Sequence, residues 1–371
     1  MNYFIEVVDR WSNKILGILQ RFPLASLSSF IVTILSIIFI EANISSPTDF
    51  ILISNKIALV ATLGIFLFPA LHLLSKKIWF KFVGIGLLVL YFYFLPLNVL
   101  DSVVMVRHGL LLLSLFFMLF WAPFMDINIS NKNIWEWTQN ILLIVLVTVI
   151  LSITTYLIFF VTMHSIERLF GFVLDTHYYL QFAILIVGLF SVNYFLGHLP
   201  KYIMLLQINK YEEVGLVFTK FVLTPIFFIY FFLLFAYIVK VIVTKAWLVD
   251  NIDMMAVGYA TVAIATYMYW TPLWDEANKL FKTFIWGSTL LLSIVLGVSI
   301  WLRLSANNIE EYYLLGLFTA WLAIISLYFI FFKKASYKWL FFSISFLIVV
   351  SQSEPLINLS VKLFDEVSKI S

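Results

Sequence analysis

The sequence predicts an all-α, polytopic transmembrane bundle of about 10 or 11 spans, with interfacial amphipathic helices at its two ends. The first observation is composition: of 371 residues 63% are hydrophobic and 12% are charged, about half the charged fraction of a soluble protein. The second is that the apolar runs are continuous and about 20 residues long, which is enough to cross a bilayer core of about 30 Å. The chain also has no cysteine, which excludes disulfides, thiolate metal sites and cysteine nucleophiles.

Residues 1–23 are predicted to form an amphipathic helix on the membrane surface. Phe4, Val8, Trp11 and Ile15 recur at helical spacing, with charged residues between them. A cleaved signal peptide is not favoured, because the charged region is long and contains acids.

Residues 24–351 are predicted to form one transmembrane domain. Its spans are expected near residues 24–40, 57–74, 82–99, 104–124, 141–162, 180–199, 221–243, 255–273, 284–302, 312–332 and 338–351. Residues 352–371 then form a C-terminal amphipathic tail. Roughly two thirds of the Lys and Arg residues fall on the side of the N-terminus, so the positive-inside rule predicts a cytoplasmic N-terminus and an outside C-terminus.

The stretch at residues 218–247 is the most informative part of the chain. It reads FTKFVLTPIFFIYFFLLFAYIVKVIVTKAW, and its polar or helix-breaking members include Pro225, Tyr230, Tyr237 and Lys240. Pro225 removes a backbone donor and loosens a helix. The two tyrosines are seven residues apart and share a helix face with Lys240. Such a polar stripe on a spanning helix is expected to face protein, which places it on the inside of the bundle.

Asn193 and Arg303 join these two tyrosines and Lys240 in the predicted substrate- or lipid-binding set. Lys240 lies near the end of its span, so it either snorkels to the headgroups or lines a solvent-filled cavity. Arg303 either pairs with Glu310 or Glu311 or binds an anion such as a lipid phosphate. Asn193 either contributes to the set or only joins helices by hydrogen bonds.

Four further polar residues form a weak candidate metal site. His164, Glu167, Asp175 and His177 lie in one short segment after the fifth predicted span, and imidazole and carboxylate groups are ligands of Zn²⁺. Their spacing matches no recognised metal signature. The alternative is that they are solvated polar groups on an amphipathic helix.

The same central stretch resembles the DUF4153 family, a family of bacterial multi-pass membrane proteins of unassigned function. The similarity is best over residues 211–332. It is carried by Phe221, Val222, Leu223, Pro225, Tyr230, Tyr237, Arg303, Tyr312, Tyr313 and Trp321. Leu248, Val249 and Asp250 replace the Pro-Lys-Gly turn of the family, and residues 305–310 replace its Tyr-Gly-x-Thr segment. The resemblance implies the cytoplasmic (inner) membrane of a bacterium.

Three functions remain open from the sequence. The first is transport or lipid handling through a polar-lined bundle interior, the second a non-catalytic membrane assembly or sensory partner, and the third a membrane-embedded enzyme for lipid-linked substrates. No Walker A, GxGxxG, HExxH or GxSxG motif occurs, so the sequence does not favour an enzyme or imply a cofactor. Membrane lipids, a membrane-protein partner or a second copy of the chain are the expected partners, and nucleic acid is not.

Overall fold

The structure is a computed structural model of the chain. It describes residues 16–42, 49–97, 99, 101–127, 129–171, 174–200, 215, 217–244, 252–274, 279–304, 309–332 and 334–352. Within these ranges every regular element is a helix, which confirms the predicted all-α class. Residues 16–21 are helical, but most of the predicted N-terminal helix and nearly all of the C-terminal tail lie outside the described residues.

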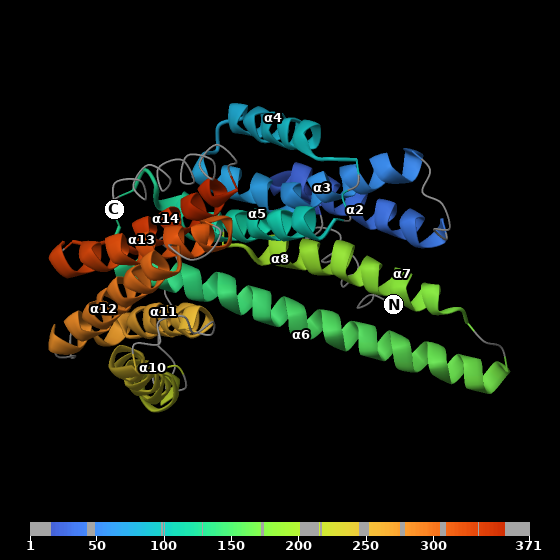
Figure 1. Cartoon of the computed structure of the whole chain (residues 1–371). Coiled ribbons are helices and arrows are strands. Elements are labelled where there is room, and N and C mark those ends of the chain that lie inside the picture. Colours follow the sequence, from blue (N-terminus) through green and yellow to red (C-terminus); the bar gives the residue numbers. More distant parts are fainter. Residues whose placement is uncertain are drawn as a thin grey trace. The chain divides into compact units, whose positions relative to one another are not determined.

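The chain divides into two compact units, which are described separately (Figure 1). Unit 1 comprises residues 1–128 and 137–203. Its elements are α2 (Pro23–Glu41), α3 (Asp49–Leu74), α4 (Trp79–Phe94), α5 (Ser102–Trp121), the 3-10 turn η1 (Ala122–Phe124), most of α6 (Asn131–Phe170), α7 (Thr176–Leu185), the π-helix η2 (Ile186–Ser191) and α8 (Val192–His198).

Unit 2 comprises residues 129–136, which include the first turn of α6, and residues 204–371. Its further elements are the π-helix η3 (Phe218–Leu223), α10 (Thr224–Thr244), α11 (Ile252–Tyr269), the 3-10 turn η4 (Thr271–Leu273), α12 (Lys279–Leu304), α13 (Ile309–Phe331) and α14 (Tyr337–Ser351).

Eight helices among the described residues are long and apolar enough to cross a membrane. Three more apolar helices are shorter, at Trp79–Phe94, Met255–Tyr269 and Tyr337–Ser351. Every predicted span coincides with a helix of one of these two groups. The span predicted at residues 104–124 is among the long ones, as Ser102–Phe124. The chain is therefore a multi-pass membrane protein.

Small and hydroxyl side chains hold the centre of unit 1 together. Helix α3 packs against α2, α4 and α5 (Figure 1). The buried residues of α2 are all small, namely Ala25, Ser26, Ser28, Ser29 and Thr33. The Ser29 hydroxyl donates to the Gly188 carbonyl of η2, and a Cβ on Gly64 of α3 would overlap the Ser28 hydroxyl. Helices in lipid gain stability by close backbone approach and interhelical hydrogen bonds, because burying apolar surface gains little there.

Aromatic rings pack against one another in unit 2. Tyr267 contacts Trp286, Phe329 and Tyr337 with ring centroids 5.0 to 5.9 Å apart, a spacing at which edge-to-face pairs are favourable. Asn131, in the first turn of α6, donates to Ala335 O at 2.8 Å and accepts from the Tyr337 amide at 3.0 Å. This single side chain therefore satisfies backbone groups at the start of α14.

Both units contain a Trp-x-Pro sequence that leads from an α-helix into a 3-10 turn. Helix α5 ends at Trp121 and runs into Ala122-Pro123, whereas α11 is followed by Trp270 and Thr271-Pro272. A 3-10 turn follows in both cases. The proline ring fits the first turn of a helix, since no donor is needed there.

Candidate functional site

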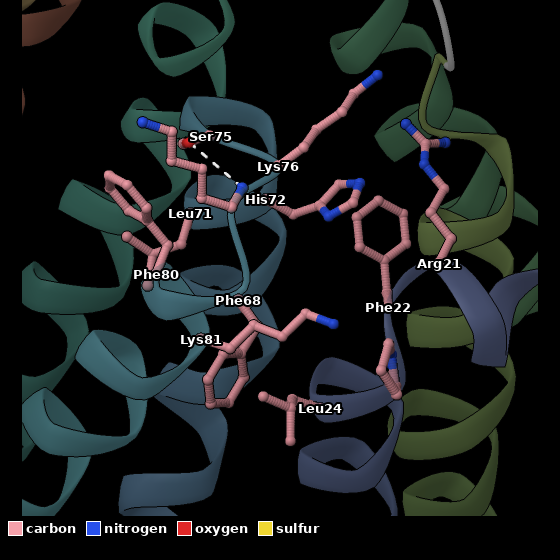
Figure 2. Close-up of a pocket in the computed structure, with 12 residues that line it drawn as sticks. Arg21, Phe22, Leu24, Phe68, Leu71, His72, Ser75, Lys76, Phe80 and Lys81 are labelled. Atoms are coloured by element: carbon pink, nitrogen blue, oxygen red, sulfur yellow. Dashed lines mark hydrogen bonds between the residues drawn. The ribbon is translucent and has the colours of Figure 1, made fainter.

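A basic pocket lies in unit 1, where the start of α2, the end of α3 and the start of α4 come together (Figure 2). Helices α2 and α3 are antiparallel neighbours, so the residues before α2 and after α3 meet at the same end of the pair. The pocket is lined by Arg21, Phe22, Pro23, Leu24, Phe68, Leu71, His72, Ser75, Lys76, Lys77, Phe80 and Lys81.

The local sequence brings these residues together. Pro23 occupies the first turn of α2, where a missing backbone donor costs nothing. Helix α3 ends at Leu74, and only residues 75–78 separate it from α4. So short a connection cannot carry the chain far from α3, so α4 begins close to the end of α3. Gly84 then lets α4 lie close to α3, because a Cβ there would be 2.8 Å from Leu71 Cδ1 and 2.9 Å from Phe68 Cε1.

The floor of the pocket is apolar. Phe22, Phe68 and Leu71 are 2%, 8% and 6% exposed, and in Figure 2 they lie, together with Leu24, below the head groups of Arg21 and Lys76. The His72 ring meets the Phe22 ring edge-on at 5.2 Å. A ligand in this pocket would thus meet hydrocarbon and aromatic surface on one side.

The rim of the pocket is cationic. Arg21, Lys76, Lys77 and Lys81 all line it, and none of the described lining residues is acidic. Arg21, Lys76 and Lys81 come from three different segments, and all of them line the same pocket as His72. In Figure 2 the Arg21 and Lys76 head groups lie at the same end of the opening, and the Lys81 ammonium points inward from α4. Like charges gathered in this way repel each other, so a bound anion would relieve an unfavourable energy.

Arg21 is fixed in place by unit 1 itself. Its guanidinium donates to Leu199 O at 2.5 Å and to Pro200 O at 2.7 Å, just beyond the end of α8. It also lies 4.6 Å from the centroid of the Phe22 ring. Burial lowers the pKa of Arg21 from its ordinary value, yet a guanidinium stays protonated in proteins. A partly desolvated, permanent charge attracts an anion more strongly than a fully hydrated one.

The predicted site residues Tyr230, Tyr237 and Lys240 lie on α10, and none of them lines the basic pocket. Tyr230 is half-buried, and its ring stacks on Tyr259 of α11 with centroids 6.3 Å apart. Its hydroxyl lies over Gly258, where a Cβ would be 2.7 Å away. Tyr237 is half-buried, and Lys240 is exposed.

The structure describes the contacts of Asn193 but not those of Arg303. Asn193 belongs to α8 in unit 1, where its Oδ1 accepts from the Ser26 hydroxyl at 3.0 Å and its Nδ2 donates to Leu189 O at 2.8 Å. It therefore joins helices, as one of the two interpretations expects. Arg303 lies in α12, but its side chain is outside the described part of the structure, as are those of Glu310 and Glu311.

The four metal-candidate residues form two separate pairs. His164 Nδ1 is 3.2 Å from Glu167 Oε2, and His177 Nδ1 is 3.0 Å from Asp175 Oδ1. Among the described residues no group of three or more potential metal ligands gathers. Glu167 has a structural use as well, since its Oε1 accepts from the Leu174 amide at 2.8 Å and closes the turn between α6 and α7.

A buried histidine, His108, forms a polar centre at the junction of α3, α4 and α5 that the sequence does not predict. His108 is 4% exposed, with Nε2 2.7 Å from Thr62 Oγ1 and Nδ1 3.0 Å from the Tyr91 hydroxyl. The Thr62 hydroxyl donates to Leu59 O at 2.6 Å, so it accepts from Nε2–H. The Nδ1 atom therefore accepts from Tyr91. Sequence spacing gives no sign of this network, because its members are far apart in the chain.

The comparisons with known proteins give no family assignment. No protein-family model matches the chain, and no curated protein or solved structure gives a significant match. The resemblance to the DUF4153 family stays an expectation from the sequence.

Proposed function

We propose that this multi-pass membrane protein binds the anionic headgroup of a membrane phospholipid at the basic pocket, as a lipid-handling protein. One observation carries the proposal: four cationic side chains from three neighbouring segments line a pocket with an apolar floor, and none of the described lining residues is acidic. Basic pockets between transmembrane helices are typical binding sites for lipid headgroups.

The depth of the pocket fits an amphiphile. It lies where α2 begins and α3 ends, and these two helices are long and apolar enough to cross the membrane. The pocket is therefore expected at the boundary between hydrocarbon and headgroups. A phospholipid places its phosphate at that depth and its acyl chains beside it. The rim would hold the phosphate, and the apolar floor would contact the glycerol and the first methylenes.

The positive-inside rule accounts for some of these lysines without any ligand. It does not require an arginine held by two carbonyls, an inward-pointing Lys81 or an aromatic floor beneath the charges. These features support binding beyond the general charge bias. If the predicted orientation holds, the site faces the inner leaflet of the membrane, which in a bacterium is the cytoplasmic side.

Transport through the bundle interior remains the prediction that involves Lys240, Tyr230 and Tyr237. The stacking of Tyr230 on Tyr259 and its approach to Gly258 explain this tyrosine as helix packing. The observations at the basic pocket favour lipid binding over transport as the first activity to test.

The test is lipid binding by the purified full chain in nanodiscs of zwitterionic phospholipid. Phosphatidylglycerol is added, and bound lipid is counted by native mass spectrometry. The variant is Lys76→Gln/Lys81→Gln, which keeps Arg21 and its hydrogen bonds to Leu199 O and Pro200 O. The matched control is Lys334→Gln/Lys338→Gln, which removes the same charge from unit 2. We expect the first pair to weaken binding about tenfold or more, because two contacts to a charged group are lost, and the control to bind like the natural chain. Equal losses in both pairs, or none in either, would reject the site.

A further inference from the structure

The charge and geometry of the pocket point to one class of anionic lipid. We infer that the basic pocket prefers a lipid phosphomonoester, such as phosphatidic acid or a polyprenyl phosphate, over phosphodiester lipids. This inference rests on the proposed lipid binding and narrows its ligand.

The number of charges is the first argument. Four cationic residues, Arg21, Lys76, Lys77 and Lys81, line this one pocket. A phosphodiester headgroup brings one negative charge, which leaves most of this repulsion in place. A phosphate monoester loses its second proton with a pKa of about 6, and neighbouring cations favour the doubly charged form. A dianion therefore neutralises more of the rim.

The directions of the donors are the second argument. Arg21 precedes α2, Lys76 lies in the connection after α3, and Lys81 lies in α4. A guanidinium has five N–H donors, and the two hydrogen bonds to Leu199 O and Pro200 O leave donors for a ligand. A terminal phosphate has three free oxygens and meets donors from three segments. A phosphodiester has two free oxygens, and its second ester group has to leave the pocket.

The size of the pocket is the third argument. The enclosed part of the pocket is small, and the rest is open to the surroundings. Phe22 and His72 form one wall, and Phe80 lines the pocket on the side away from Arg21 in Figure 2. A compact phosphate fits such a space better than a headgroup that carries a sugar or a second glycerol.

The experiment compares four ligands on the full chain in zwitterionic nanodiscs: phosphatidic acid, a polyprenyl phosphate, phosphatidylglycerol and inorganic phosphate. Dissociation constants are measured by native mass spectrometry at low and at high salt. We expect at least one phosphomonoester lipid to bind about tenfold more tightly than phosphatidylglycerol, with the difference reduced by salt. In Lys76→Gln/Lys81→Gln the preference should fall below about threefold, while Lys334→Gln/Lys338→Gln should keep it.

The outcomes separate this inference from the proposed function. Equal affinity for all three anionic lipids, lost in the pocket variant alone, would overturn the phosphomonoester preference and leave lipid binding standing. Anionic lipids that bind no better than the zwitterionic background would overturn both. Inorganic phosphate that competes as well as the lipids do would show a site for the free anion, and this would overturn the lipid assignment. The two phosphomonoester arms tell a phosphatidate from a polyprenyl phosphate.

Discussion

At the scale of single residues, the hydrogen bonds of unit 1 show how polar groups are satisfied inside a membrane protein. The His108 network runs in one direction, from Tyr91 through His108 to Thr62 and then to the Leu59 carbonyl. Each buried donor of the His108 network has an acceptor. A break in it would leave a polar group unpaired where little water can replace the partner.

This network gives a prediction for Thr62→Val. The change removes the acceptor of the His108 Nε2–H, so we expect the free energy of unfolding to fall by about 1–3 kcal/mol. The measurement is equilibrium unfolding in mixed micelles. The control is Thr154→Val on α6, because Thr154 is exposed and its hydroxyl bonds only within its own helix, to Ile150 O at 2.8 Å. The control should change stability by less than about 0.5 kcal/mol. Similar losses of stability in both variants would show that the His108 network contributes no more than a hydrogen bond within one helix.

A second residue prediction concerns Asn193. Asn193→Ala removes the acceptor of the Ser26 hydroxyl and should cost about 0.6–1.7 kcal/mol of stability, as expected for hydrogen bonds between transmembrane helices. Anionic lipid binding by the folded protein should stay the same, because Asn193 does not line the basic pocket. The two quantities are measured on one preparation. A loss of lipid binding without a loss of stability would show that Asn193 takes part in lipid binding.

At the scale of helices, the packing of α2 on α3 depends on side chains that are small. Hydrophobicity does not distinguish the face of α2 that packs against α3 from the face that meets lipid, because both are apolar or carry only hydroxyl groups. The difference lies in side-chain volume. Ser28 and Gly64 allow the two backbones to approach, whereas the larger Leu27 and Phe30 stay exposed.

We therefore expect Gly64→Ala to destabilise the protein by about 1–3 kcal/mol, because the new methyl group overlaps Ser28. Gly86→Ala is the matched control. Its Cβ would meet nothing within 4 Å, and Ala is preferred over Gly inside a helix by up to about 1 kcal/mol. Thermal unfolding in detergent compares the two. Ser28→Ala combined with Gly64→Ala should recover part of the loss. If both glycine variants behave alike, close approach of α2 and α3 is not what stabilises the pair.

At the scale of the whole molecule, the direction of the chain through the membrane decides which leaflet the basic pocket faces. Helix α2 has 19 residues and is about 28 Å long, which is close to the bilayer core. Its two ends should therefore emerge on opposite sides. The positive-inside rule predicts that the end that carries Arg21 faces the cytoplasm.

The chain contains no cysteine, so single cysteines can report this orientation without background. A membrane-impermeant maleimide should label Ala42→Cys, at the far end of α2, in intact cells. It should label Lys77→Cys, beside the pocket, only in inside-out vesicles. The opposite pattern would place the pocket in the outer leaflet and overturn the predicted orientation. Labelling of both positions from one side would show that α3 (Asp49–Leu74), which lies between them in the chain, does not cross.

The sequence by itself determined the all-α class, the positions of the helices and the membrane environment. These properties follow from the length and apolarity of local segments, which spacing along the chain reports directly. The partners of individual polar residues were decided only by the tertiary structure. Arg21 and Lys81 line one pocket because α2 and α3 are antiparallel neighbours and Gly84 brings α4 close to α3. His108 forms hydrogen bonds with Thr62 and Tyr91 on two other helices. In a membrane nearly every helix is apolar all round, so hydrophobic periodicity does not reveal which faces meet. That choice depends on side-chain volume and on hydrogen bonds between residues distant in sequence.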